Sequence, residues 1–177
     1  MRIRLLQEED KPALSNFDCG DPDLNDFIRE DAWLYRDAMF AQTWLFFDSD
    51  RILAYASMVN DRIATAQLSA SKHEVLREVR QSLGKDPMKS GQIPAVKLAR
   101  LAVAERGSGI GSLFVASLCQ LFASYDNRTG CRLMTVDAYN QPRVLNFYFN
   151  LDFERQSAKV LDDAETVPLV LDLRRFR

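Results

Sequence analysis

Hydrophobic and polar residues alternate with two different periods in the first third of the chain. Residues 2–6 are predicted to form a strand, and the apolar runs 43–47 and 52–56 flank the polar turn Asp48–Asp50, which is typical of a β-hairpin. Between the first strand and the hairpin, apolar residues at spacings of three, four and seven predict an amphipathic helix over 24–39, in one piece or two. Asp21 is expected to cap it, with Pro22 in the first turn. The apolar stripe comprises Leu24, Phe27, Ile28, Leu34, Tyr35, Ala38 and Met39.

The second half of the chain alternates predicted strands and helices. Its first strand has apolar side chains on both faces, as a central strand covered on both sides does. An early hairpin followed by such a run indicates an α/β fold with a mixed sheet. The expected strands are 95–103, 132–138 and 167–173, and the expected helices are 71–83, 112–125 and 141–149.

Composition and charge narrow the classes of function. The chain has 177 residues, 47% hydrophobic and 27% charged, which suits one domain over 1–177. Three widely spaced cysteines without a Cys-x-x-Cys pair suggest reduced thiols in a cytoplasmic protein, and we expect Cys19 to be structural. A single histidine, His73, gives little basis for a zinc site or a Ser-His-Asp triad, so no metal is expected. No stretch reaches the ~18 apolar residues that span a bilayer, so no membrane contact is expected.

The most informative segment is a glycine-rich loop that follows a predicted strand and precedes a predicted helix. Glycines let backbone amides approach a ligand, and a helix N-terminus adds unpaired N–H donors, so Leu101–Gly111 predicts an anion site that Arg106 would reinforce. A P-loop would need a lysine before Ser112, and a Gly-x-Gly-x-x-Gly fingerprint would need glycine at that position. The pattern that fits is Arg-x-x-Gly-x-Gly.

This pattern resembles motif A of the GNAT superfamily of N-acetyltransferases, whose loop cradles the pyrophosphate of coenzyme A. The preceding residues resemble the strand whose backbone pairs with the pantetheine arm. Only Ala104 and Glu105 separate that strand from Arg106, which is a shorter spacing than the family usually has. The resemblance implies acetyl-CoA as co-substrate and a binding set of Leu101, Ala102, Val103, Arg106, Gly107, Ser108, Gly109, Ile110 and Gly111.

A second segment, residues 135–153, resembles motif B of the same superfamily. The resemblance implies that Tyr148 is the general acid that protonates the departing coenzyme A thiolate, whereas without it a core aromatic would be expected. Asp152 replaces the glycine that usually follows. Asn140 has two interpretations: it caps the helix, or it contacts the pantetheine as the resemblance implies.

The general base is not identified by the sequence. Asp137 near a strand end and Glu105 beside the loop are both candidates, and a water relay is a third possibility. Lys97 and Arg100 are unusual in an apolar strand, and they indicate either a polar cleft or side chains that extend to the edge of the sheet.

The N-terminal segment Phe17–Leu24 resembles the start of a bacterial subgroup that includes toxins acetylating aminoacyl-tRNA. The formal net charge of −2 does not favour a tRNA partner, so the expected function is acetyl transfer from acetyl-CoA to a primary amine of a small molecule or protein. The alternatives are a toxin-type enzyme acting on aminoacyl-tRNA and a non-catalytic acyl-CoA-binding module. The resemblance implies a GNAT fold, with a mixed, largely antiparallel twisted sheet flanked by helices, and it leaves a homodimer and an antitoxin partner open.

Overall fold

The computed structural model describes residues 1–68, 77–78, 81, 84, 91–157 and 163–177. Two compact units divide the chain. The first unit comprises Met1–Asn60 and Leu98–Leu118, and the second comprises Asp61–Lys97 and Cys119–Arg177. Strand β3 (Arg51–Ala64), strand β4 (Gln92–Val103) and helix α5 (Ile110–Ala123) contribute residues to both units. A single domain over 1–177 stays a prediction.

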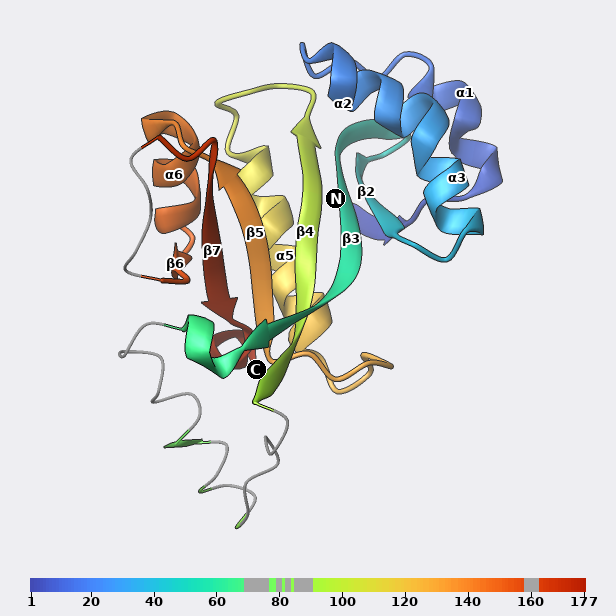
Figure 1. Cartoon of the computed structure of the whole chain (residues 1–177). Helices are drawn as coiled ribbons and strands as arrows, with labels where there is room; N and C mark the ends of the chain where they lie inside the picture. Colours follow the sequence, from blue (N-terminus) through green and yellow to red (C-terminus); the bar gives the residue numbers. More distant parts are fainter. Residues whose placement is uncertain (69–76, 79–80, 82–83, 85–90, 158–162) are drawn as a thin grey trace. The chain divides into compact units, whose positions relative to one another are not determined.

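In the part of the chain that the structure describes, seven strands join one mixed sheet in the order β1-β2-β3-β4-β5-β7-β6 (Figure 1). Strands β4 and β5 pair in parallel, whereas β1 with β2, β2 with β3, β5 with β7 and β6 with β7 pair antiparallel. The expectation of a mixed, largely antiparallel sheet with flanking helices is therefore confirmed. The expected strands are present with shifted ends, and β3 continues well beyond the predicted 52–56. The remaining strands are β1 (Arg2–Leu5), β2 (Gln42–Asp48), β5 (Leu133–Tyr139), β6 (Glu154–Arg155) and β7 (Thr166–Asp172).

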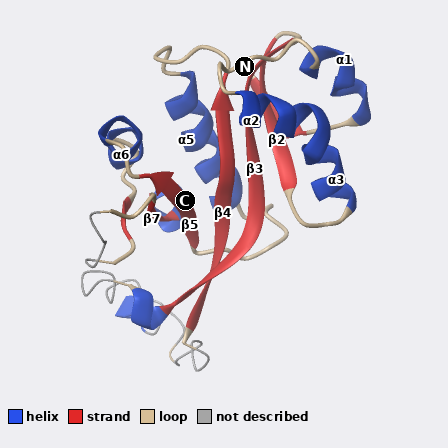
Figure 2. Ribbon diagram, turned by 45° about the horizontal axis from the view of Figure 1, so that its top comes forward, coloured by secondary structure: helices blue, strands red, loops and turns tan. Residues whose placement is uncertain are grey.

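In the first unit, the two faces of β2 pack against different helices. The Phe46 ring stacks on Phe114 of α5, with the ring centroids 5.1 Å apart. Leu45 and Phe47 belong instead to a buried cluster with the N-terminal helical segments, whose members also include Phe27. Alternating side chains along one strand therefore fix both layers of this unit (Figure 2). These helices are α1 (Lys11–Leu14), α2 (Pro22–Asp26) and α3 (Ala32–Asp37).

The helix expected over 24–39 begins as predicted and is then interrupted. The Asp21 carboxylate accepts a 3.3 Å hydrogen bond from the Leu24 N–H, which confirms the predicted cap. A π-helical turn over Phe27–Asp31 then separates α2 from α3. The extra residue in the π turn rotates the side chains that follow it by about 100° around the helix axis. Ala32 and Trp33 are therefore the buried residues at the start of α3.

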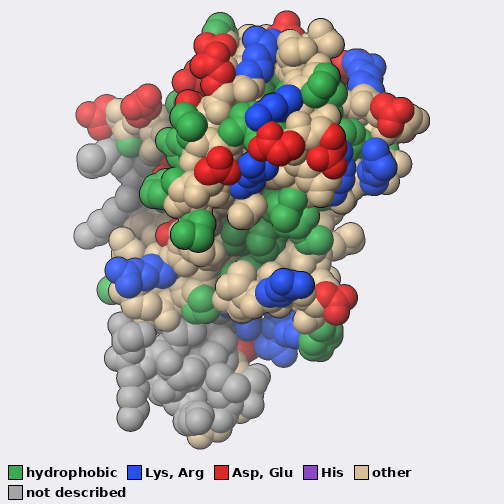
Figure 3. Space-filling view, turned by 90° about the vertical axis from the view of Figure 1, so that its right-hand side faces the viewer, with side chains coloured by type: hydrophobic (Ala, Val, Ile, Leu, Met, Phe, Trp, Pro, Cys, Tyr) green, Lys and Arg blue, Asp and Glu red, His purple; other side chains and the backbone are tan. Residues whose placement is uncertain are grey.

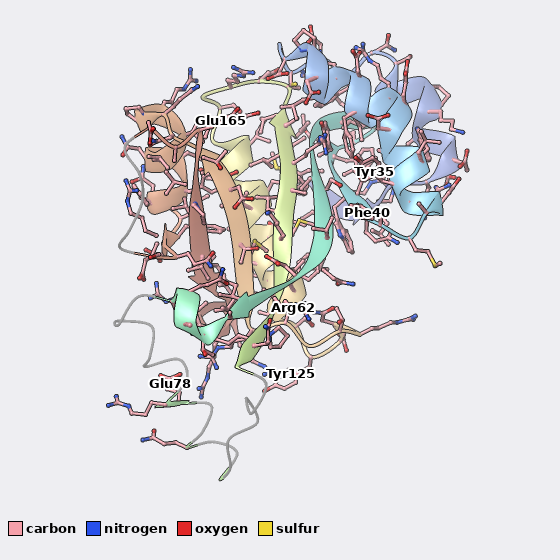
Figure 4. All side chains as sticks on the ribbon, in the orientation of Figure 1. Tyr35, Phe40, Arg62, Glu78, Tyr125 and Glu165 are labelled. Atoms are coloured by element: carbon pink, nitrogen blue, oxygen red, sulfur yellow. The ribbon has the colours of Figure 1, made fainter. Side chains whose placement is uncertain are left out.

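The predicted apolar stripe is therefore wrong at Leu34, Ala38 and Met39, whereas Tyr35 still packs against the buried cluster. Leu34 and Met39 are 66% and 91% exposed, and Phe40 is 68% exposed. Figure 3 views this side of the first unit, where hydrophobic side chains lie among charged ones. The Tyr35 and Phe40 rings meet edge to face at 5.5 Å (Figure 4), so Tyr35 keeps an aromatic neighbour near the end of α3.

The second unit is built around β5. It pairs along its whole length with β7, from Leu133↔Asp172 to Tyr139↔Thr166, and in parallel with β4 from Ala95↔Leu133 to Lys97↔Thr135. Helix α6 (Pro142–Phe149) contacts β5. The predicted helices 112–125 and 141–149 correspond to α5 and α6, whereas most of 71–83, including His73, lies outside the described residues. Short 3-10 turns occur at Glu8–Asp10, Thr65–Gln67 and Leu173–Phe176.

Candidate functional site

The glycine-rich loop of the first unit has the backbone shape that its sequence indicates. Strand β4 ends at Val103, the Ala104 N–H bonds the Leu53 carbonyl at 2.9 Å, and α5 begins at Ile110. Gly107 and Gly109 have φ of +83° and +80°, which disfavours any other residue there. A Cβ added at either glycine would meet no atom within 4 Å. Both glycines therefore face open space at the surface, as Gly20 and Gly130 also do.

Arg106 is the cation that this loop offers to an anion. It is exposed, and among the described residues it forms no ion pair. Its neighbour Glu105 is paired with Arg51, with Nη2 and Oε1 2.6 Å apart. The Ser108 hydroxyl donates to the Glu105 carbonyl at 2.7 Å and accepts a longer 3.4 Å bond from the Ile110 N–H, so it holds the loop against the start of α5.

The strand residues that precede the loop divide between core and surface. Ala102 is buried in the cluster of the first unit, whereas Leu101 and Val103 are only half-buried. Gly111 lies in the first turn of α5. The residues predicted to bind the co-substrate, Leu101 to Gly111, thus form one continuous strand–loop–helix segment. Their contacts with a ligand stay predictions.

Arg100 and Cys19 of the first unit are structural in this arrangement. The Arg100 guanidinium lies 4.1 Å from the centre of the Phe27 ring, so this cation covers an aromatic side chain rather than lining a polar cleft. Cys19 is buried, and its thiol lies 3.2 Å from the Asn25 side-chain oxygen. Burial raises the pKa of the Cys19 thiol, which opposes a nucleophilic role and agrees with the structural role expected.

In the second unit, Tyr148 lies on the buried side of α6 beside Leu145. Its side chain is only 6% exposed and its ring meets Phe153 edge to face at 5.3 Å. Burial raises the pKa of Tyr148, so its hydroxyl stays protonated at neutral pH. Among the described residues, none forms a hydrogen bond with that hydroxyl, which leaves it available as a donor.

The ends of α6 explain two features of the second motif. Gln141, not Asn140, is the N-cap residue, so the interpretation of Asn140 as a cap is wrong. The Asn140 carboxamide donates instead to the Ala164 carbonyl at 3.0 Å, and its backbone N–H donates to the Glu165 carbonyl at 2.9 Å. Asp152 has φ of +64°, the left-handed conformation that favours glycine and that aspartate tolerates better than most residues.

Four polar side chains share one face of the sheet in the second unit. The Lys97 ammonium contacts the Asp137 carboxylate, and the Thr135 hydroxyl donates to Asp61 at 2.6 Å. The polar-face interpretation thus fits Lys97, although Asp61 and Thr135 are not evident from the sequence. Asp61 lies in the part of β3 that the hydrophobic pattern does not predict as strand.

Metal and membrane sites were not expected. No three His, Cys, Asp or Glu side chains of the described residues are grouped closely enough to hold a metal ion. Of the helices described, none has the length and apolar character needed to cross a membrane.

Comparison with known proteins identifies the fold. No protein-family model matches the chain, and no curated protein sequence matches it. Solved structures do match. The toxin AtaT complexed with acetyl-methionyl-tRNAfMet has a TM-score of 0.72 and 21% identity over 98% of this chain and 95% of that chain. A tyrosine-to-phenylalanine mutant of KacT has a TM-score of 0.70 and 20% identity over 99% and 98%. AtaTR bound with acetyl-CoA has a TM-score of 0.67 and 20% identity over 99% and 94%. The predicted GNAT fold is therefore confirmed.

Proposed function

We propose that the protein is an acetyl-CoA-dependent N-acetyltransferase whose acceptor is the amino group of an aminoacyl-tRNA. The observation that carries the proposal is the glycine-rich loop before α5, in which Gly107 and Gly109 have positive φ and Arg106 is exposed and forms no ion pair with a described residue. Backbone N–H groups, a helix N-terminus and a free guanidinium together suit a pyrophosphate. Structural likeness to proteins complexed with acetyl-CoA and with an acetylated aminoacyl-tRNA supports this choice.

In the first unit, Arg106 to Gly111 would bind the pyrophosphate, and the backbone of Leu101 to Val103 would pair with the pantetheine arm. In the second unit, Asn140 would contact the pantetheine and Tyr148 would donate its proton to the sulfur as the thioester is cleaved. Burial keeps that proton on the hydroxyl at neutral pH, which supports an acid rather than a base.

The acceptor is the finer part of the proposal. A net charge of −2 favours a small-molecule or protein amine, which stays the second candidate. The tRNA acceptor ranks first because the fold matches AtaT complexed with acetyl-methionyl-tRNAfMet along nearly the whole chain. Phosphate binding depends on local cations rather than on net charge, so an acidic chain does not exclude tRNA.

The test is transfer of radiolabelled acetyl from acetyl-CoA to three acceptor pools: charged total tRNA, free amino acids with polyamines, and peptides. We expect label in charged tRNA, and we expect Tyr148→Phe to reduce it by about 10²–10⁴-fold while acetyl-CoA still binds. Tyr125→Phe, which changes an exposed tyrosine of the same unit, is the matched control. Label in another pool would select the second candidate, and binding without transfer to any pool would indicate a non-catalytic module.

A further inference from the structure

The face of β5 that carries Leu133, Thr135, Asp137 and Tyr139 changes character along the strand. Leu133 and Thr135 are 2% and 4% exposed, whereas Asp137 and Tyr139 are exposed. The opposite face stays apolar and packs on α5, where the thiol of Cys119 lies 3.8 Å from the sulfur of Met134. This face of β5 is therefore buried at Leu133 and Thr135 and becomes a solvent-accessible polar surface at Asp137 and Tyr139.

The polar row on this face has an unbalanced charge. Its members are Asp61 on β3, Lys97 on β4, and Thr135 and Asp137 on β5, so two carboxylates face one ammonium. Asp61 accepts hydrogen bonds from the Thr135 hydroxyl and from the Arg62 backbone N–H, at 2.6 Å and 2.7 Å, and no described cation pairs with it. Arg62 (labelled in Figure 4) follows Asp61 directly, so alternation along the strand turns its side chain to the other face. The row thus carries one net negative charge.

The Lys97–Asp137 contact shows that an ammonium fits against the Asp137 carboxylate. The two side chains are 32% and 45% exposed, so the pair is reachable from solvent. Lys97 pairs with Thr135 in the β4–β5 ladder, and Asp137 lies two residues further along β5 on the same face. Here a primary ammonium already rests on the Asp137 carboxylate. The acceptor of an N-acetyltransferase is also a primary ammonium until it loses a proton.

We infer that the row formed by Asp61, Lys97, Thr135 and Asp137 binds the ammonium of the acceptor and that the Asp137 carboxylate takes its proton. The inference rests on the proposed acetyl transfer and assigns the base that the sequence left open. Glu105, the other candidate, belongs to an exposed ion pair with Arg51 in the first unit and to no such row.

The proton balance of the reaction agrees with these roles. The ammonium gives one proton to Asp137, and the nitrogen lone pair then forms the bond to the thioester carbonyl carbon. As the carbon–sulfur bond breaks, the sulfur takes the Tyr148 proton. The second proton of the nitrogen returns through water to Tyr148, and Asp137 releases its proton to solvent. No oxidant or metal is required.

Binding of a simple probe tests the inference separately from catalysis. Methionine methyl ester presents the α-ammonium and ester of an aminoacyl-tRNA end, and at a pH of about 6 its amine is protonated. We expect calorimetry with the full chain to show an increase of about ten-fold in Kd for Asp137→Asn. Asp126→Asn, which changes an exposed carboxylate of the same unit, should leave Kd unchanged.

Lys97→Met separates a role in binding from a structural role. Removing the resident ammonium leaves two carboxylates without a cation, so the probe should bind about three- to ten-fold more tightly. Weaker binding in both variants would indicate structural damage and overturn the inference, as would no binding to the wild-type chain or an unchanged Kd for Asp137→Asn. Failure of transfer to charged tRNA would count against the proposed function and leave these binding results standing.

Discussion

The Tyr55 hydroxyl donates a 2.6 Å hydrogen bond to the Leu24 carbonyl, which joins β3 to the helical segment where α2 approaches the π turn. Tyr55 is fully buried, and its ring lies 5.6 Å from Phe17 and 6.0 Å from Phe27. Burial also raises the pKa of Tyr55, so the hydroxyl remains a donor at neutral and mildly alkaline pH. One side chain thus connects the hairpin of the first unit to its helices.

Tyr55→Phe should lower the free energy of unfolding by about 0.5–1.5 kcal/mol, because it removes one hydrogen bond to the Leu24 carbonyl, which still accepts from the Phe27 N–H. Urea unfolding at pH 7 measures the loss. Tyr125→Phe removes an exposed hydroxyl and should change the free energy by less than about 0.5 kcal/mol. Equal effects of the two substitutions would show that the Tyr55–Leu24 bond does not stabilise the fold.

Gly109→Ala should distinguish the contribution of the loop to stability from its contribution to acetyl-CoA binding. Gly109 and Gly20 have φ of +80° and +74°, and a Cβ added at either meets no atom within 4 Å. Alanine at either position should therefore cost about 1 kcal/mol of stability through backbone strain alone. Only Gly109→Ala should also weaken acetyl-CoA binding, measured by calorimetry. Equal affinity in both variants would remove the loop from the proposed binding site.

Tyr148→Phe should leave stability nearly unchanged even though the residue is buried. No described group forms a hydrogen bond with its hydroxyl, so the substitution leaves no hydrogen-bond partner unsatisfied. The packing against Phe153 is also kept. We expect a change below about 0.5 kcal/mol in the free energy of unfolding. A larger loss would mean that the hydroxyl has a structural partner, and a loss of activity in this variant could then not be assigned to proton transfer.

The fold was predictable from the sequence wherever one hydrophobic period persisted. The strands and the helices α5 and α6 follow such runs, and Asp21 with Pro22 marks the start of α2 because capping is a local interaction. The π turn was not predictable, because the bond from the Ala32 N–H to the Phe27 carbonyl inserts a residue without interrupting the apolar spacing. The exposed Leu34 follows from that insertion, whereas Met39 lies beyond the end of α3 with a φ of +55°.

The candidate site also has parts that were predictable from the sequence and parts that were not. Glycines with positive φ and the charge of Arg106 are local properties, so the loop was evident in the sequence. The pairing of Asp61 with Thr135 joins residues 74 positions apart and depends on strand register, which hydrophobic periodicity does not specify. Gln141 replaces Asn140 as the cap because Asn140 forms bonds with the segment before β7, again through a non-local contact.

Cys119 should make the stability of the protein fall at alkaline pH. The thiol is fully buried, and burial raises its pKa to about 12, whereas a thiol in the unfolded chain has a pKa of about 8.5. Between these values the folded state keeps a proton that the unfolded state loses, so stability is complete below a pH of about 8.5 and declines as pH rises.

Urea unfolding from pH 7 to 10 should show wild type losing up to about 1.4 kcal/mol more per pH unit than Cys119→Ala above pH 9. Cys119→Ala should itself be less stable at pH 7, since it loses packing against Met134. Parallel pH profiles for the two proteins would show that the thiol does not titrate differently in the folded and unfolded states.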